Sequence, residues 1–147
     1  MARWAPERTD TIRALADEVL QNYGHGRVIV AVDGAAGMDV AITAKFADDL
    51  AVELRGQGHE VARETVAADA TADALRSSLV GPFRMAGGGD AMLVVDGSTL
   101  LGAELRGFWN FSARLDGAEP STERADATAI LNLADPEHPR RVFADSC

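Results

Sequence analysis

The spacing of apolar residues along the chain alternates between a helical and an extended pattern. From Thr9 to Tyr23 the apolar residues recur every three or four positions, which predicts an amphipathic helix that ends at Gly24. Val28–Val32 is apolar at every position, as expected for a central parallel strand buried on both faces. A second helix is predicted from Val40 to Arg55, with a buried stripe made of Ile42, Phe46, Leu50 and Leu54.

The same alternation continues through the rest of the chain. The further predicted elements are a strand at Glu60–Val66, a short helix at Thr71–Leu79, a strand at Ala91–Val95, a helical turn at Leu100–Arg106, and strands at Asn110–Leu115 and Ala127–Leu133. Turns are predicted at Gly81–Pro82 and across the flexible Gly87–Gly89 run. The proline-rich tail predicts no further regular element, although Val142 and Phe143 are expected to dock back onto the core.

Strands that alternate with helices predict a doubly wound α/β fold with three layers, here with five strands in a mostly parallel sheet. Residues 1–147 are expected to form a single domain. Only Gly117–Asp126 separates the last two predicted strands, which is close to the minimum length of a parallel crossover. One edge of the sheet is therefore expected to lack a covering helix.

Composition narrows the classes of partner. A hydrophobic content of 47% and a charged content of 25% are ordinary for a globular protein, while the net charge of −9 argues against nucleic acid and anionic membranes as partners. The single cysteine, Cys147, excludes an intramolecular disulfide. The N-terminus lacks an apolar signal core, and we expect a cytoplasmic chain that is complete at its start.

The stretch RVIVAVDGAAGMDVAIT, residues 27–43, has the strand, glycine turn and helix order of the phosphate-binding loop G-x-x-x-x-G-K-[ST]. Counted from Gly34, the second motif glycine falls on Asp39, the lysine on Val40 and the hydroxyl residue on Ala41. Neither Val40 nor Ala41 can contact phosphate or Mg²⁺ as lysine and threonine do. All three chemical positions of the motif are therefore changed.

Asp39 changes the loop further, because it puts a carboxylate near a helix N-terminus where an anion would otherwise bind. Aspartate is also a favoured N-cap and accepts backbone N–H groups two or three residues further on. We expect a site that is occupied by its own side chain. A phosphate brought beside Asp39 would meet like charge where the motif provides a cation.

Four stretches of the chain resemble the uridine kinase-like branch of P-loop nucleoside kinases. They are RVIVAVDGAAG, LRGQGHEV, LVVDGSTLLGAELRGFWNFSARLD and ADATAILNLADPEHPRRVF, which together cover well over half of the sequence. The resemblance implies a P-loop NTPase-like fold and an ancestry of ATP- and Mg²⁺-dependent phosphorylation of a nucleoside 5′-hydroxyl. It also implies that Asp96 matches the acid near metal and phosphates, and that Asp33 matches the aspartate just before the loop.

The chain departs from this family at the catalytic acids, the substrate-binding segment and the lid. The family carries a paired-acid motif after the second strand, for catalysis and ribose contact, whereas this chain has Val66–Asp69 with Asp69 alone. The substrate segment is shortened, and the arginine-bearing lid is reduced to GAEPSTERAD. Loss of loop, base, substrate segment and lid predicts a degenerate, pseudokinase-like protein without ATP-dependent phosphoryl transfer and without a cofactor.

Several residues remain candidates for a function of this degenerate chain. Asp33, Asp39 and Asp96 are expected to converge at the carboxyl ends of the strands, as acid or base groups acting on a small molecule. The candidate ligand-binding residues of the former nucleotide cleft are Gly34, Ala35, Ala36, Gly37, Met38, Asp69, Glu104, Arg106 and Trp109. The simpler alternative is that Asp33 and Asp96 are inherited strand-end residues held by hydrogen bonds, with Asp39 only a helix cap.

The sequence leaves three functions open. They are a binding or interaction module, an enzyme with new acid–base chemistry in the old cleft, and a residual nucleoside phosphotransferase. A small-molecule ligand and a homodimer are the expected partners, because a shortened lid exposes apolar surface. The histidines His25, His59 and His138 show no metal-ligand spacing, so no metal site is predicted.

Overall fold

Helices and strands alternate along the chain in the computed structural model, which describes residues 7–35, 38–67, 69–86, 88–98, 100–101, 105, 107–117 and 127–142. In order, the elements are α1 (Arg8–Asn22), β1 (Arg27–Gly34), α2 (Val40–Gly56), β2 (Val61–Thr65), α3 (Ala72–Leu75), η1 (Arg76–Val80), α4 (Gly81–Met85), β3 (Ala91–Ser98), β4 (Phe111–Asp116), β5 (Ala129–Asn132) and β6 (Arg140–Val142). The α/β alternation predicted from the sequence is confirmed.

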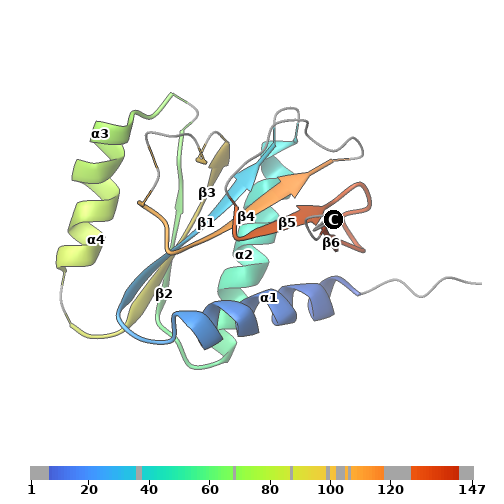
Figure 1. Cartoon of the computed structure of the whole chain (residues 1–147), viewed down its shortest axis with the longest axis horizontal. Coiled ribbons are helices and arrows are strands. Elements are labelled where there is room, and N and C mark those ends of the chain that lie inside the picture. The colour runs from blue at the N-terminus through green and yellow to red at the C-terminus, as the bar shows by residue number, and fades with distance from the viewer. Residues whose placement is uncertain are drawn as a thin grey trace, which may run out of the picture.

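Within the described residues, the strands form one six-stranded sheet with the order β2-β3-β1-β4-β5-β6 (Figure 1). Neighbouring strands from β2 to β5 pair in parallel, and β6 pairs antiparallel with β5. The predicted mostly parallel sheet is confirmed, but the prediction of five strands was wrong by one. β1 lies in the interior of the sheet, between β3 and β4.

The sixth strand comes from the tail, for which the sequence predicted no regular element. Pairing of Val142 with Ile130 brings the backbone of the tail back to β5, but the Val142 side chain is 45% exposed and does not enter the core. Phe143 lies outside the described residues. The tail is also tied to α1, whose Arg8 donates to the carbonyl of Pro136 at 2.7 Å and whose Thr11 donates to that of Pro139 at 3.1 Å. These contacts join segments about 130 residues apart, so no local pattern could reveal them.

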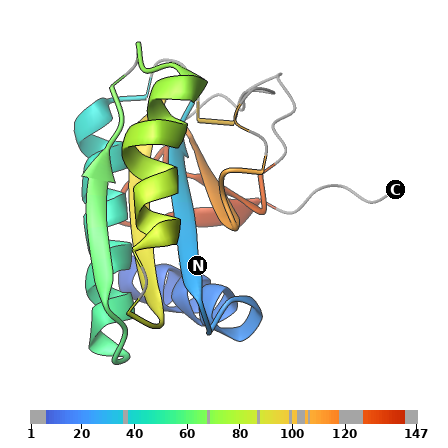
Figure 2. The same ribbon diagram turned by 90° about the vertical axis from the view of Figure 1, so that its left-hand side faces the viewer.

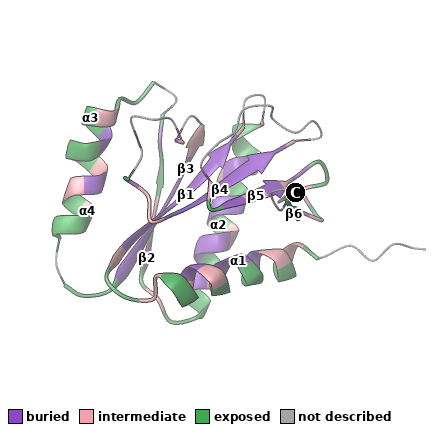
Figure 3. Cartoon of the chain, viewed as in Figure 1, coloured by how far each residue is buried: buried purple, intermediate pink, exposed green. Residues whose placement is uncertain are grey.

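Helices cover the sheet from two sides (Figure 2). α1 and α2 pack on one face, and the continuous helix formed by α3, η1 and α4 packs on the other. Because side chains alternate along β1, Val28, Val30 and Val32 belong to the first core and Ile29 and Ala31 to the second. The interior strands are consequently buried along most of their length (Figure 3).

The helix on the second face is longer than predicted and passes through the expected Gly81–Pro82 turn. Pro82 has no N–H to donate to the carbonyl of Ser78, the acceptor that a regular helix would use. The helix widens instead into a π turn, in which the Gly81 N–H bonds the carbonyl of Arg76, five residues back. The turn prediction failed because the widened helix accommodates the proline.

Two predictions fall on parts of the chain that lie mainly outside the described residues. The helical turn at Leu100–Arg106 is one, since only Leu100, Leu101 and Leu105 of it are described. The connection between β4 and β5 is the other, because residues 118–126 are not described. Among the helices that are described, none combines the length and apolar character needed to cross a membrane.

Replacing Gly81 with alanine tests the π turn. In an ordinary helix interior this change stabilises by roughly 1 kcal/mol. A Cβ at Gly81 would instead lie 2.7 Å from the Arg76 carbonyl oxygen, so we expect a loss of about 1–3 kcal/mol in urea unfolding. Gly56→Ala, at the end of α2 with no atom within 4 Å of the new Cβ, is the matched control and should be neutral or slightly stabilising. A Gly81→Ala variant as stable as the control would contradict this account.

Candidate functional site

The segment that follows β1 makes a tight turn into α2. The Ala35 N–H bonds the Leu115 carbonyl of β4 at 2.9 Å, and the Met38 N–H bonds the Ala35 carbonyl at 2.9 Å. Ala36 and Gly37, two predicted ligand-binding positions, lie outside the described residues. Gly34 has no space for a side chain, because a Cβ there would lie 2.5 Å from the buried Thr43 hydroxyl of α2.

Asp39 is the N-cap of α2, as the sequence predicted. Its carboxylate accepts the Ala41 N–H at 2.9 Å, and its carbonyl accepts the N–H groups of Ile42 and Thr43. Val40 is 75% exposed and Ala41 is exposed as well. The positions of the motif lysine and hydroxyl therefore carry apolar side chains directed to the surface, beside an acid that bonds the helix end.

Asp33 lies one residue before the end of β1 and is buried on the face covered by α3 and α4. Its carboxylate accepts the Leu100 N–H at 2.9 Å. Arg114 is its direct partner across the β1–β4 ladder and forms a 3.2 Å ion pair with Asp116, two residues further along the same face of β4. All three charged side chains are buried. They form a charged cluster, which we call the Asp33 cluster, at the carboxyl edge of the sheet.

Burial raises the pKa of Asp33 above its ordinary value, because the ionised carboxylate loses its hydration. The hydrogen bond from Leu100 and the charge of Arg114 both lower this pKa, and the nearby Asp116 raises it. Desolvation is the largest of these effects. A carboxyl group of this kind holds its proton to a higher pH than an exposed aspartate and can donate or accept one.

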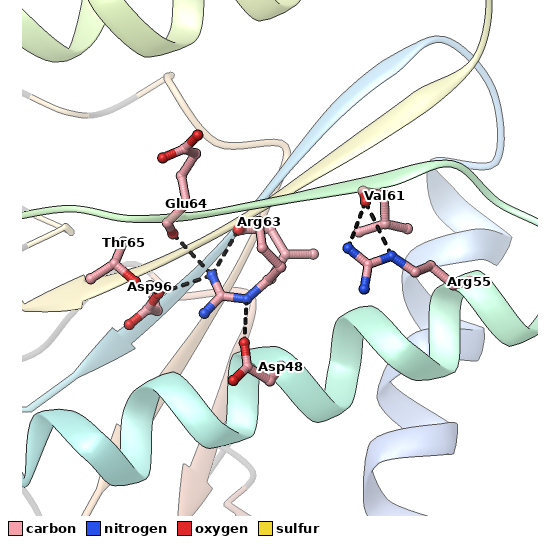
Figure 4. A network of polar contacts seen from close by, with 8 residues as sticks. Asp48, Arg55, Val61, Arg63, Glu64, Thr65 and Asp96 are labelled. Carbon is pink, nitrogen blue, oxygen red and sulfur yellow. Dashed lines mark hydrogen bonds and ion pairs between the residues drawn. The ribbon is translucent and has the colours of Figure 1, made fainter.

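Asp96 is also buried but lies on the opposite face of the sheet, toward α2 (Figure 4). Its carboxylate accepts the Thr65 hydroxyl at 2.7 Å and forms a 2.9 Å ion pair with Arg63, both from β2. The Arg63 guanidinium also bonds Asp48 of α2 at 2.9 Å. Asp96 is therefore held by partners from its own chain.

Two of the three predicted catalytic aspartates, Asp33 and Asp96, lie on opposite faces of the sheet, so the expected convergence of these two was wrong. Asp96 is in register with Val32, whose side chain faces α2, and Asp33 is the next residue, so the two carboxylates point to opposite sides of the sheet. Parallel strand ends do meet at one edge, as reasoned from the sequence. The error was to ignore that adjacent register positions alternate between faces.

The remaining predicted ligand residues are dispersed. Asp69 is exposed in the turn after β2. The Trp109 indole donates to the Leu100 carbonyl at 2.8 Å and packs edge-to-face on Phe108 at 5.8 Å, so it contributes to the second core. Glu104 and Arg106 lie outside the described residues. Within the described ranges, no three histidine, cysteine or acidic side chains are placed to hold a metal ion.

Sequence reasoning missed Arg63, Arg114 and Asp116. Arg114 and Asp116 had a signal, because Ser112, Arg114 and Asp116 alternate with the apolar Phe111, Ala113 and Leu115 along one strand and must therefore share a face. Arg63 had a weaker one, as a charged residue at a position of β2 that faces α2. Its partners come from two other elements, so its role required the tertiary structure.

The comparisons with known proteins identify the fold. A solved structure described as a possible uridine kinase from Bacillus stearothermophilus aligns with 73% of this chain and 80% of its own, with a TM-score of 0.58 and 17% sequence identity. No family model matches the sequence, and no curated protein matches it either. The chain thus shares the α/β fold of this possible uridine kinase, and at this identity the likeness concerns the fold alone.

Replacing Asp33 with asparagine tests the electrostatics of the Asp33 cluster. Because the pKa of Asp33 is raised on folding, the folded state binds the proton more tightly than the unfolded state, whose pKa is near 3.8. Wild-type stability should therefore fall relative to Asp33→Asn as the pH rises above this value, in urea unfolding from pH 3 to 8. The exposed Asp69→Asn change is the control and should follow the wild-type profile. A difference that is constant with pH would refute the assignment.

Proposed function

We propose that this chain is a degenerate nucleoside kinase-like protein that does not transfer phosphate from ATP and acts as a binding or interaction module. The uridine kinase-like fold supports this lineage, while the altered phosphate-loop residues support loss of the activity. A small molecule at the former nucleotide cleft, or a second copy of the chain, is the proposed partner. Fold likeness alone cannot assign a reaction, so the proposal depends on the site.

The observation that carries the proposal is the Asp39 carboxylate bonded to the Ala41 N–H at the start of α2. Helix N-termini attract phosphate because their N–H groups are unpaired and the helix dipole is positive there. Here an anion of the chain itself is already present. An incoming triphosphate would have to displace or approach that carboxylate, with Val40 and Ala41 offering no cation and no hydroxyl.

Restoring the motif tests this interpretation. In the variant Asp39→Gly/Val40→Lys/Ala41→Thr the carboxylate is removed and the lysine and hydroxyl are supplied. We expect millimolar Mg²⁺–ATP to raise the melting temperature of this variant and to leave that of the wild type unchanged. Val52→Lys is the matched control for added charge, because Val52 is also an exposed valine of α2, at 62% exposure. This control should behave as the wild type.

Two results would contradict the proposal. One is stabilisation of the wild-type chain by Mg²⁺–ATP at concentrations where the control compound, inorganic sulfate, has no effect. The other is transfer of the γ-phosphate from labelled ATP to a nucleoside by the wild-type chain. The second result would establish the residual nucleoside phosphotransferase as the function.

The Asp33 cluster favours a second candidate, an enzyme with new acid–base chemistry on a small molecule. A desolvated carboxyl group with a raised pKa beside a buried arginine is a typical feature of catalytic sites, and it also occurs in structural ion pairs. In this version Asp33 exchanges the proton, while the carboxylates of Asp39 and Asp96 are held by the Ala41 N–H and by Arg63 and take no part in the chemistry.

This second candidate predicts turnover that depends on Asp33. Wild type and Asp33→Asn would be incubated with a mixture of small metabolites, and depletion would be followed by mass spectrometry. We expect a substrate to be consumed by the wild type at a rate at least about 100-fold above that of the variant, the usual contribution of general acid–base catalysis. Asp39→Asn serves as the control and should retain the rate. Equal consumption by all three chains would exclude Asp33 as the acid or base.

A further inference from the structure

The polar network between β2, β3 and α2 surrounds one guanidinium group with oxygen atoms. Arg63 Nη1 lies 2.9 Å from Asp96 Oδ1, 2.9 Å from the Glu64 carbonyl oxygen and 3.1 Å from the Val94 carbonyl oxygen. Arg63 Nε lies 2.9 Å from Asp48 Oδ1. These four oxygens come from three different elements, β2, β3 and α2, and Figure 4 shows those of Asp96, Glu64 and Asp48 directed at the guanidinium group.

We call the oxygens of Asp96, Asp48, Glu64 and Val94 around the guanidinium group the oxygen cage. One side of this cage is buried and the other is exposed to water. The Asp96 side chain is 3% exposed and that of Arg63 is 16% exposed, whereas the Asp48 side chain at the rim is 63% exposed. A carboxylate as buried as Asp96 requires a cation or several hydrogen-bond donors beside it, and Thr65 supplies only one donor. Among the described residues, the charge of Arg63 is therefore the main compensation for the charge of Asp96.

We propose that the cage is a cation site which the chain fills with its own side chain. Arg63 takes the place of a cation from solution and makes Asp96 unavailable to one. When the guanidinium group is removed, two carboxylates and two carbonyl oxygens face the space that it occupied, and this space is open to solvent on the side of Asp48. A small cation from solution then binds in that space. This inference uses the polar network alone, and it would survive a finding that the wild-type chain binds ATP at its phosphate loop.

The test is chemical rescue of Arg63→Ala in the full chain. Methylguanidinium supplies the guanidinium group that the substitution removes, together with one of the two lost side-chain carbons, so at 10 mM it should raise the melting temperature of Arg63→Ala by about 3 °C or more. The wild type should show no shift, because its cage is full. A second arm with MgCl₂ determines whether the same oxygens also accept a metal ion, and NaCl at equal ionic strength corrects both arms for screening.

Two further variants make the result specific. Arg55→Ala is the matched control, because Arg55 lies at the same sheet edge and donates its two hydrogen bonds to one neutral oxygen, the Val61 carbonyl, at 3.2 and 2.8 Å. This variant should gain nothing from methylguanidinium. The double variant Arg63→Ala/Asp96→Asn should also gain nothing, because the cage has lost its buried charge.

The readout remains decisive if Arg63→Ala does not fold by itself. Binding that is confined to the folded state then appears as recovery of the folded circular dichroism spectrum with added cation. Rescue of Arg63→Ala by either cation, absent from both further variants, supports the proposal. Failure of both cations to stabilise or refold Arg63→Ala overturns it, and so does an equal shift in the wild type or in Arg55→Ala.

Discussion

The burial of β1 on both faces governs where charge can lie in this protein. β1 is flanked by β3 and β4, and its side chains enter two separate apolar cores in alternation. A charged residue at the end of such a strand must find a partner on whichever face its position dictates. Asp33 and Asp96, one register step apart on neighbouring strands, are for this reason separated by the sheet itself. Asp96 forms an ion pair with Arg63, whereas Arg114 offsets only part of the cost of burying Asp33.

Each acidic residue that the sequence marked at the carboxyl edge is bonded within the chain. Asp33 accepts the Leu100 N–H, Asp39 accepts the Ala41 N–H, and Asp96 is bonded by Arg63 and Thr65. Such bonds lower the tendency of a carboxylate to take a ligand from solution, because any ligand must first replace them. In a parallel α/β fold the carboxyl ends of the strands can be open to a ligand. In this chain, hydrogen bonds and an ion pair from its own residues already occupy the carboxylates there.

The contacts of the three aspartates favour a structural role for two of them and leave a chemical role open for the third. The helix cap at Asp39 and the ion pair at Asp96 support the simpler interpretation of these two residues as structural groups. Asp33 differs, because its largest electrostatic effect is unfavourable burial of the charge rather than a favourable partner. The fold likeness at 17% identity is compatible with a binding module and with an enzyme, since chemistry depends on individual residues rather than on the scaffold.

Local sequence patterns determined the elements that have a strong period or a clear cap: α1, α2 and the interior strands lie within a few residues of their predicted bounds, and Asp39 caps α2 as expected. Only the tertiary structure decided the rest. β6 forms because α1 and β5 hold a tail with no pattern of its own, and Arg63 pairs with carboxylates from two other elements. The physical reason is that hydrophobic period and capping are properties of neighbouring residues, whereas pairing of charges across a sheet depends on register and face, which arise only when distant segments come together.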